Sequence, residues 1–205
     1  MSKEYYQDFV TEKSFKILQE LKNSCQFILI GGWAVFLYTQ SLKSKDIDIV
    51  VDYGELEKLR RLFNLTKNDR LHKYEIIKEE IDIDIYVSHY SQLAIPAEEI
   101  KKYSRSLEGF LVPQPEIMLI LKQKAHLERR GSAKGEKDKI DIIALLKDTD
   151  FDFSFYRKML LVYGLTGFLE ELKSLLQSTI EVSLLNLNQF QFSRFKKQMQ
   201  AQLTK

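Results

Sequence analysis

Two aspartates one residue apart, Asp46 and Asp48, are the residues of this chain whose types and spacing most directly suggest chemistry. They fall in the segment Lys45–Val51, whose alternation of polar and apolar residues predicts a β-strand, so both side chains should point to the same face. Neighbouring carboxylates repel each other and lose hydration, and a divalent cation between them relieves both costs. Taken alone, the pair also fits an amphipathic strand with a solvated face.

The sequence before this pair favours the metal site. Gly31-Gly32 follows a strand-like run and opens a helix-like run, and the second strand comes directly afterwards. Glycines at a strand-to-helix turn let a phosphate approach the backbone N–H groups at a helix N-terminus. The order of these parts therefore predicts a site for a nucleoside triphosphate and magnesium.

A second alternating segment, Ile81–Val87, offers two further carboxylates, Asp82 and Asp84. Both should lie on one face of their strand, so either could complete a group of three acids with Asp46 and Asp48. The residue pattern leaves this choice open.

Gly-Gly, then Asp-x-Asp, then an acid on a later strand resembles the signature of the nucleotidyltransferase superfamily with the polymerase-beta-like fold. Within it, the Gly-Gly-Trp-Ala start is similar to minimal, lincosamide-modifying and AbiEii toxin-type transferases, over about residues 20–147. The resemblance favours Asp84 as the third acid, because apolar residues follow it. It also implies that Ser44 and a neighbouring basic residue contact the phosphates; Leu42 stands at the position of the family's arginine, so Lys45, or Lys43 in its place, would supply the charge.

A cationic segment further along matches the same relatives. Lys122, Arg129, Asp138 and Asp141 fit the Lys-x-x-Ala-x-x-x-Arg and Lys-Asp-x-x-Asp pattern of AbiEii-type transferases. Lys122 and Arg129 are seven residues apart and would share one helix face, where they could hold triphosphate oxygens. The resemblance adds Asp141 to the nucleotide-binding residues. The alternative is an ordinary amphipathic helix with surface charges.

The resemblance implies a metal-dependent nucleotidyltransferase that moves a nucleoside monophosphate from an NTP such as ATP to an acceptor hydroxyl and releases pyrophosphate. Mg²⁺ or Mn²⁺ would be held by Asp46, Asp48 and Asp84, with Asp84 or Asp82 accepting the proton. The acceptor could be a small molecule, an RNA 3′ end or a protein, and relatives in toxin–antitoxin systems suggest an antitoxin partner. The alternative function is a non-catalytic nucleotide- or RNA-binding module on the same fold.

The elements that would position these residues indicate an α+β fold. Strands are expected within residues 25–51, 71–87 and 109–112, and helices dominate afterwards. We therefore expect a mixed-sheet core with helices on one face in residues 1–112, and a helical region in residues 113–205 that packs on it. Pro113-Gln114-Pro115 marks the boundary.

Composition sets broader bounds on the function. The chain has 205 residues, is 44% hydrophobic and has a formal net charge of +2, so it should form a folded core without a strong bias toward nucleic acid. The single cysteine, Cys25, excludes an internal disulfide. No apolar run is long enough to cross a membrane and the first residues do not resemble a signal peptide, so we expect a cytoplasmic protein without a membrane partner.

Overall fold

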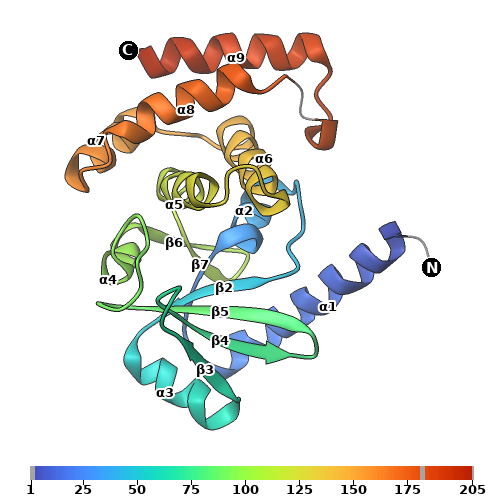
Figure 1. The fold of residues 1–205 in the computed structure, drawn as a ribbon, viewed down its shortest axis with the longest axis vertical. Helices are drawn as coiled ribbons and strands as arrows, with labels where there is room; N and C mark the ends of the chain where they lie inside the picture. Colours follow the sequence, from blue (N-terminus) through green and yellow to red (C-terminus); the bar gives the residue numbers. More distant parts are fainter. Residues whose placement is uncertain (1–2, 181–182, 205) are drawn as a thin grey trace.

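A mixed seven-stranded sheet forms the centre of the protein (Figure 1). The structure is a computed structural model and describes residues 3–180 and 183–204. The strand order is β3-β4-β5-β2-β1-β7-β6. The strands are β1 (Ile28–Ile30), β2 (Ile47–Val51), β3 (Leu65–Asn68), β4 (Lys73–Lys78), β5 (Ile81–Val87), β6 (Ser104–Leu107) and β7 (Phe110–Pro113). The pairs β2–β5 and β1–β7 are parallel and the other pairs are antiparallel.

Helices occur between the strands and dominate after β7, which confirms the predicted α+β class. They are α1 (Lys3–Ser24), α2 (Gly31–Thr39), α3 (Tyr53–Leu62), α4 (Ala97–Ile100), α5 (Pro115–Glu128), α6 (Ala133–Asp148), α7 (Phe153–Val162), α8 (Gly167–Ser178) and α9 (Gln189–Thr204). Short 3₁₀ turns lie at η1 (Lys101–Tyr103) and η2 (Ser183–Leu185).

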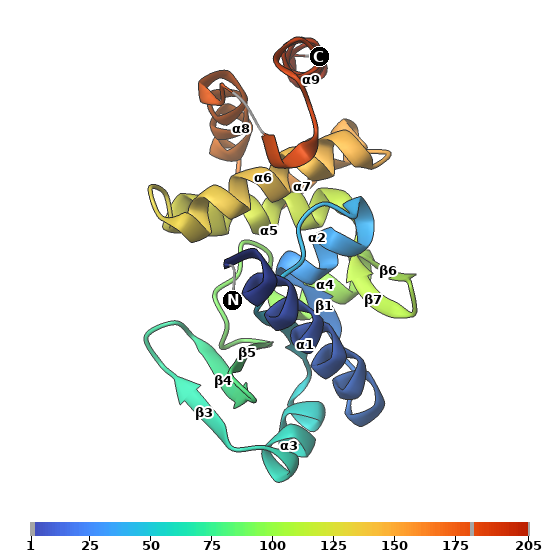
Figure 2. The same ribbon diagram turned by 90° about the vertical axis from the view of Figure 1, so that its right-hand side faces the viewer.

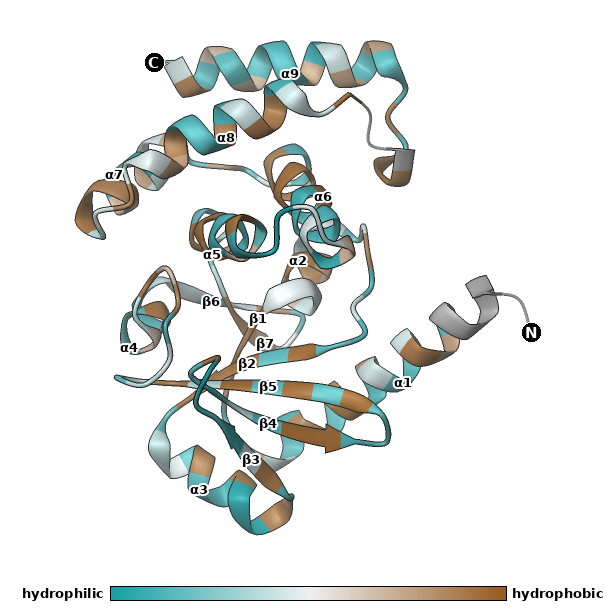
Figure 3. Ribbon diagram, viewed as in Figure 1, coloured by the Kyte–Doolittle hydropathy of each residue, from teal (hydrophilic) through white to brown (hydrophobic). Residues whose placement is uncertain are grey.

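The two central strands have one apolar and one polar face, which Figure 3 shows as alternating colours along β2 and β5. Isoleucines at alternate positions of both strands are buried, and the aspartates between them lie on the other face. α1 and α3 lie on one side of these strands and α5 lies on the other (Figure 1). Helices therefore cover a second face as well as the expected one, because the buried isoleucines also need apolar partners.

The change from strand to helix occurs at the expected Pro113-Gln114-Pro115 segment. β7 ends at Pro113 and α5 begins at Pro115, whose missing N–H costs nothing in the first turn of a helix. α5 then packs on α6 and also contacts α2 and β7, so the helical region lies against the core. The division of the chain into two domains at this point stays a prediction.

The last helices form a layer on the side of α5 and α6 away from the sheet (Figures 1 and 2). α8 and α9 pack together, and Phe192, Met199 and Leu203 of α9 are buried. The Arg157 guanidinium of α7 donates to the backbone oxygen of Gln202 at 3.1 Å. Among the described helices, none is both long and apolar enough to cross a membrane.

Two short strands were not expected from the sequence. β3 has the sequence LTKN and β6 the sequence SRSL, and neither shows a clear apolar alternation. Both lie at the edges of the sheet, where one neighbouring strand is sufficient and few side chains need burial.

Candidate active site

Asp48 and Asp84 are direct neighbours across two parallel strands. The register of β2 and β5 aligns Asp48 with Asp84, so both carboxylates stand on the same face of the sheet. The Tyr86 hydroxyl, on this face of β5, donates to Asp48 Oδ1 at 3.5 Å. Strand pairing thus brings together two acids that are far apart in the chain.

The remaining acids occupy different surroundings. Asp46 lies just before β2, and its Oδ2 atom is 3.0 Å from the Lys134 ammonium. Asp82 is exposed and is not one of the residues that line the cavity described below, whereas Asp84 is. The geometry therefore places Asp84, not Asp82, beside Asp48.

Both glycines of the predicted turn are required by close contacts. Gly31 has φ of +69°, and a Cβ atom there would lie 2.1 Å from Asp48 Oδ2. A Cβ atom on Gly32 would lie 2.6 Å from the Ser44 hydroxyl. α2 starts at this point, and Ile30 at its N-cap makes no side-chain cap hydrogen bond. The turn therefore brings the backbone close to Asp48 and Ser44 at the start of a helix, whose N–H groups can bind an anion.

A cavity of about 700 Å³ joins these parts between the sheet and helices α5 and α6. Most of the predicted site residues line it: Gly31, Gly32, Ser44, Lys45, Asp46, Asp48, Asp84, Lys122 and Arg129. Asp82 and Asp141 do not line it. Its size falls in the range of small-molecule sites, on the order of 300–1,000 Å³.

Lys122 is held inside the protein by two carboxylates of α6. Its ammonium is 3.0 Å from Asp138 Oδ1 and 2.7 Å from Asp141 Oδ2, and only 8% of its side chain is exposed. Burial opposes the charged form, but Asp141 and then Asp138 outweigh it and raise the pKa of Lys122. Arg129 extends the group, with Nη2 at 3.2 Å from Asp138 Oδ2. Asp141 therefore positions Lys122 rather than lining the cavity itself.

The structure adds a lysine that the sequence analysis did not place in the site. Lys137 of α6 donates to the Ser44 hydroxyl at 3.2 Å, and its ammonium would lie 3.2 Å from a Cβ atom on Gly32. It forms no ion pair with a carboxylate in the described part of the chain. Burial lowers its pKa. A partly buried cation beside the start of a helix is suited to binding a phosphate. The sequence could have indicated this role, because Lys137 directly precedes Asp138 in the segment that matches the transferases.

The central acids carry negative charge that the protein alone does not fully compensate. Burial raises the pKa of Asp48; the Lys122 charge opposes this and the Asp46 charge adds to it. Burial and then the Asp48 charge raise the pKa of Asp84 to about 6. Hard, crowded carboxylate oxygens are the donors that Mg²⁺ and Mn²⁺ prefer, so these residues fit such an ion.

The described acids do not form a ready-made cluster of metal ligands. Over residues 3–180 and 183–204, no three acidic, histidine or cysteine side chains already converge as they would around a metal ion. Lysines contact two of the acids instead: Lys134 contacts Asp46, and Lys73 contacts Asp84 at 2.6 Å. This agrees with the general rule that Mg²⁺ is held by one or two carboxylates together with substrate phosphates.

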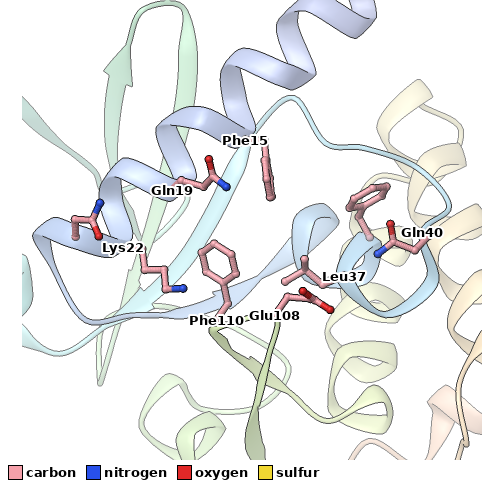
Figure 4. A pocket seen from close by; sticks show the side chains of 9 residues that line it. Phe15, Gln19, Lys22, Leu37, Gln40, Glu108 and Phe110 are labelled. Atoms are coloured by element: carbon pink, nitrogen blue, oxygen red, sulfur yellow. The ribbon is translucent and has the colours of Figure 1, made fainter.

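A separate cavity of about 490 Å³ lies between α1, the end of α2 and the β6–β7 hairpin (Figure 4). Phe15, Phe110 and Lys22 border it, and the Lys22 ammonium lies 4.8 Å from the centre of the Phe110 ring. It is bordered by the last residues of α2, whereas the acids lie at the first residues of that helix. Its lining contains none of the aspartates described above.

Comparisons with known proteins support the fold. No protein-family model matches the chain, and no curated protein matches it. A nucleotidyltransferase candidate from Helicobacter pylori superposes with a TM-score of 0.52 at 14% identity, covering 100% of this chain and 98% of that one. The H. pylori protein JHP933 gives a TM-score of 0.48 at 14% identity, covering 100% and 95%.

The Megavirus polyadenylate synthase gives a TM-score of 0.45 at 16% identity over 72% of this chain, which spans only 33% of that enzyme. At these identities a likeness shows the fold alone. Together with the sheet and the position of the Gly-Gly turn, the full-length match at a TM-score of 0.52 supports one conclusion. The chain has the fold of the nucleotidyltransferase superfamily.

Proposed function

We propose that this protein is a metal-dependent nucleotidyltransferase that moves a nucleoside monophosphate from an NTP to an acceptor hydroxyl and releases pyrophosphate. The observation that carries the proposal is the alignment of Asp48 with Asp84 across β2 and β5, next to the Gly31-Gly32 turn. The acids that would hold the metal and the turn that would bind the phosphates line one cavity, which supports the proposal.

The triphosphate would lie against the cationic side of the cavity. The N–H groups at the start of α2, the Ser44 hydroxyl and the Lys137 ammonium would donate to its oxygens. Arg129 lines the same cavity and would counter the charge that builds on the leaving pyrophosphate. Lys134, whose side chain is 67% exposed, can turn from Asp46 to the phosphates at little cost.

The acids would serve the metal and the acceptor. Asp46, Asp48 and Asp84 would hold Mg²⁺ or Mn²⁺, which supplies charge neutralisation and lowers the pKa of the acceptor hydroxyl when bound. Asp84 would accept the proton of that hydroxyl, as a carboxylate within reach of the acceptor can. Asp48 lies beside it and would keep the reacting groups close.

The alternative, a nucleotide-binding module without catalysis, has one observation in its favour. Lys134 and Lys73 already neutralise two of the acids, so a cation is not needed for the fold to form. This alternative predicts nucleotide binding without transfer, so the same experiment separates the two functions.

The decisive experiment is a transfer assay with each labelled nucleoside triphosphate, Mg²⁺ and separate RNA, protein and small-molecule fractions of a cell extract. We expect one fraction to take up label and the label to require metal. It would also identify the acceptor and show whether a toxin-like target or a partner protein is involved.

Asp84→Asn and Asp82→Asn make a matched pair on one strand. Loss of a general base costs roughly 100-fold or more in rate, so Asp84→Asn should lose transfer while Asp82→Asn stays close to wild type. Equal damage in both variants would contradict the assignment. Nucleotide binding by the wild type with no label transferred would favour the binding module.

A further inference from the structure

Three carboxylates stand in a row across three neighbouring strands. The register aligns Glu75 of β4 with Asp84 of β5, and Asp84 with Asp48 of β2. Residues aligned in this way project from the same face, and like charges directly opposite each other destabilise a sheet. The row contains two gaps between carboxylates, and each needs a cation.

One of these gaps is filled by the protein itself. The Lys73 ammonium lies 2.6 Å from Asp84 Oδ2 and 3.0 Å from Glu75 Oε1, and only 12% of its side chain is exposed. The Asn68 amide donates to the same Glu75 oxygen at 2.9 Å and helps to fix it. Lys73 is therefore a built-in cation shared between two acids.

The other gap, between Asp84 and Asp48, is where the proposed function places a divalent ion. The Lys73 ammonium that contacts Asp84 Oδ2 is shared with Glu75, which lies on the other side of Asp84 from Asp48 in this row. The contact of Lys134 with Asp46 is different, because that lysine is mostly exposed and pairs with no second carboxylate among residues 3–180 and 183–204.

We propose that Lys73 is a positioning residue for Asp84, an inference that rests on the proposed function. Lys73 keeps the Asp84 carboxylate facing Asp48, and Glu75 shares the ammonium so that it does not compete fully with the metal. Lys73 acts in this arrangement through the Asp84 carboxylate that it contacts.

Removing Lys73 and removing the charge of Glu75 should have two different effects. Without Lys73, Glu75 and Asp84 repel each other and Asp84 turns out of position, so chemistry suffers while nucleotide binding is kept. Without the charge of Glu75, the Lys73 ammonium pairs with Asp84 alone and competes more strongly with the metal. A higher metal concentration is then required for activity. A lysine that only stabilised the fold would produce neither pattern.

The test compares Lys73→Gln, Lys73→Arg and Glu75→Gln with Lys78→Gln as the matched control. Lys78 is on the same strand and pairs with Glu20 of α1, away from the cavity. Partners of metal ligands affect activity by roughly 10–100-fold, so Lys73→Gln should lower kcat by about 10-fold or more and leave the KM for nucleotide within about 2-fold. Lys73→Arg should restore part of kcat, and Lys78→Gln should match the wild type.

Calorimetry with Mn²⁺ and a non-hydrolysable nucleotide supplies a readout that does not depend on turnover. Glu75→Gln should weaken Mn²⁺ binding by about 3-fold or more, because the undivided ammonium competes for Asp84. This measurement on Glu75→Gln still tests the inference if Lys73→Gln does not fold.

Two results would overturn the inference while leaving the proposed function in place: a kcat of Lys73→Gln equal to that of Lys78→Gln, or Mn²⁺ binding to Glu75→Gln as tight as in the wild type. Absence of metal-dependent nucleotide binding in the wild type would instead remove the proposed function, and this inference with it.

Discussion

At the scale of single residues, the Gly31-Gly32 turn is the part of the candidate site that least tolerates an added side chain. A Cβ atom on Gly32 would meet both atoms of the Ser44 side chain, at 2.6 and 2.9 Å, and would approach Lys137. Little room remains for any side chain here once a phosphate is bound.

Gly32→Val should therefore raise the KM for nucleotide. Displacing binding groups by about 1 Å costs up to roughly 100-fold, so we expect an increase of about 10- to 100-fold. Gly167→Val is the control, since nothing lies within 4 Å of a Cβ atom there. Steady-state kinetics of the two folded variants check this, and a normal KM in Gly32→Val would mean that the phosphates bind elsewhere.

A second residue-scale prediction concerns the free energy of unfolding without metal. The pKa of Asp84 is about 6 in the folded protein and about 3.9 in an unfolded chain, so its ionised form is disfavoured by folding. This cost is absent below about pH 4, grows as pH rises through the folded pKa and is complete above about pH 7.

Asp84→Asn removes that cost. With a chelator present, we expect the variant to be more stable than the wild type by about 1–3 kcal/mol at pH 8 and nearly equal at pH 4. Urea unfolding at both pH values measures this, with Asp82→Asn as the exposed control. A less stable Asp84→Asn at pH 8 would show that its pairing with Lys73 outweighs burial and repulsion.

At the scale of elements, a buried ionic group joins α5 and α6. Lys122 comes from α5, and Asp138 and Asp141 come from α6; both aspartates are buried. Such a group is costly to leave incomplete, because a buried charge without its partner is not solvated.

Lys122→Ala should thus destabilise the protein as well as impair transfer. Removing one partner of a buried pair costs about 3–5 kcal/mol, whereas Lys124→Ala, which breaks an exposed pair with Glu128, should cost about 0–1 kcal/mol. Unfolding free energies of the two variants check the difference. If both lost the same small amount, the buried group would not hold α5 on α6.

At the scale of the whole molecule, metal and nucleotide should act together on stability. Lysines contact Asp84 and Asp46, and the acids do not converge on an ion by themselves within the described residues, so the proposed function needs the triphosphate to complete the ligand set. A ligand at 100 times its Kd adds about 2.7 kcal/mol to the free energy of unfolding.

Thermal unfolding should accordingly shift upward with Mn²⁺ and a nucleotide present together, and much less with either alone. Asp48→Asn should abolish the combined shift. An equal shift from the nucleotide alone would contradict a shared metal and phosphate site.

Strand alternation and the Gly-Gly turn are local patterns, so the sequence predicted the fold class and placed the turn and the Asp46–Asp48 pair in one site. Ser44, Lys45, Lys122 and Arg129 were added by the resemblance to known transferases, and they line the same cavity. The alternation of Ile81–Val87 left Asp82 and Asp84 equivalent, and only the register with β2 separated them. Lys73, Lys134 and Lys137 were not placed in the site, because charged residues at the ends of elements look alike until packing sets their partners. The same limit applies to the edge strands β3 and β6.

The parallel pairing of β2 and β5 also has a consequence for folding. These strands are separated in the chain by α3, β3 and β4, so their pairing closes a long loop and must choose one register. A slip of one residue would turn Asp84 in among the isoleucines and expose isoleucine to water. Because a misaligned chain would lose both its packing and its paired acids, the fraction of a refolded preparation that is native should equal the fraction that is active.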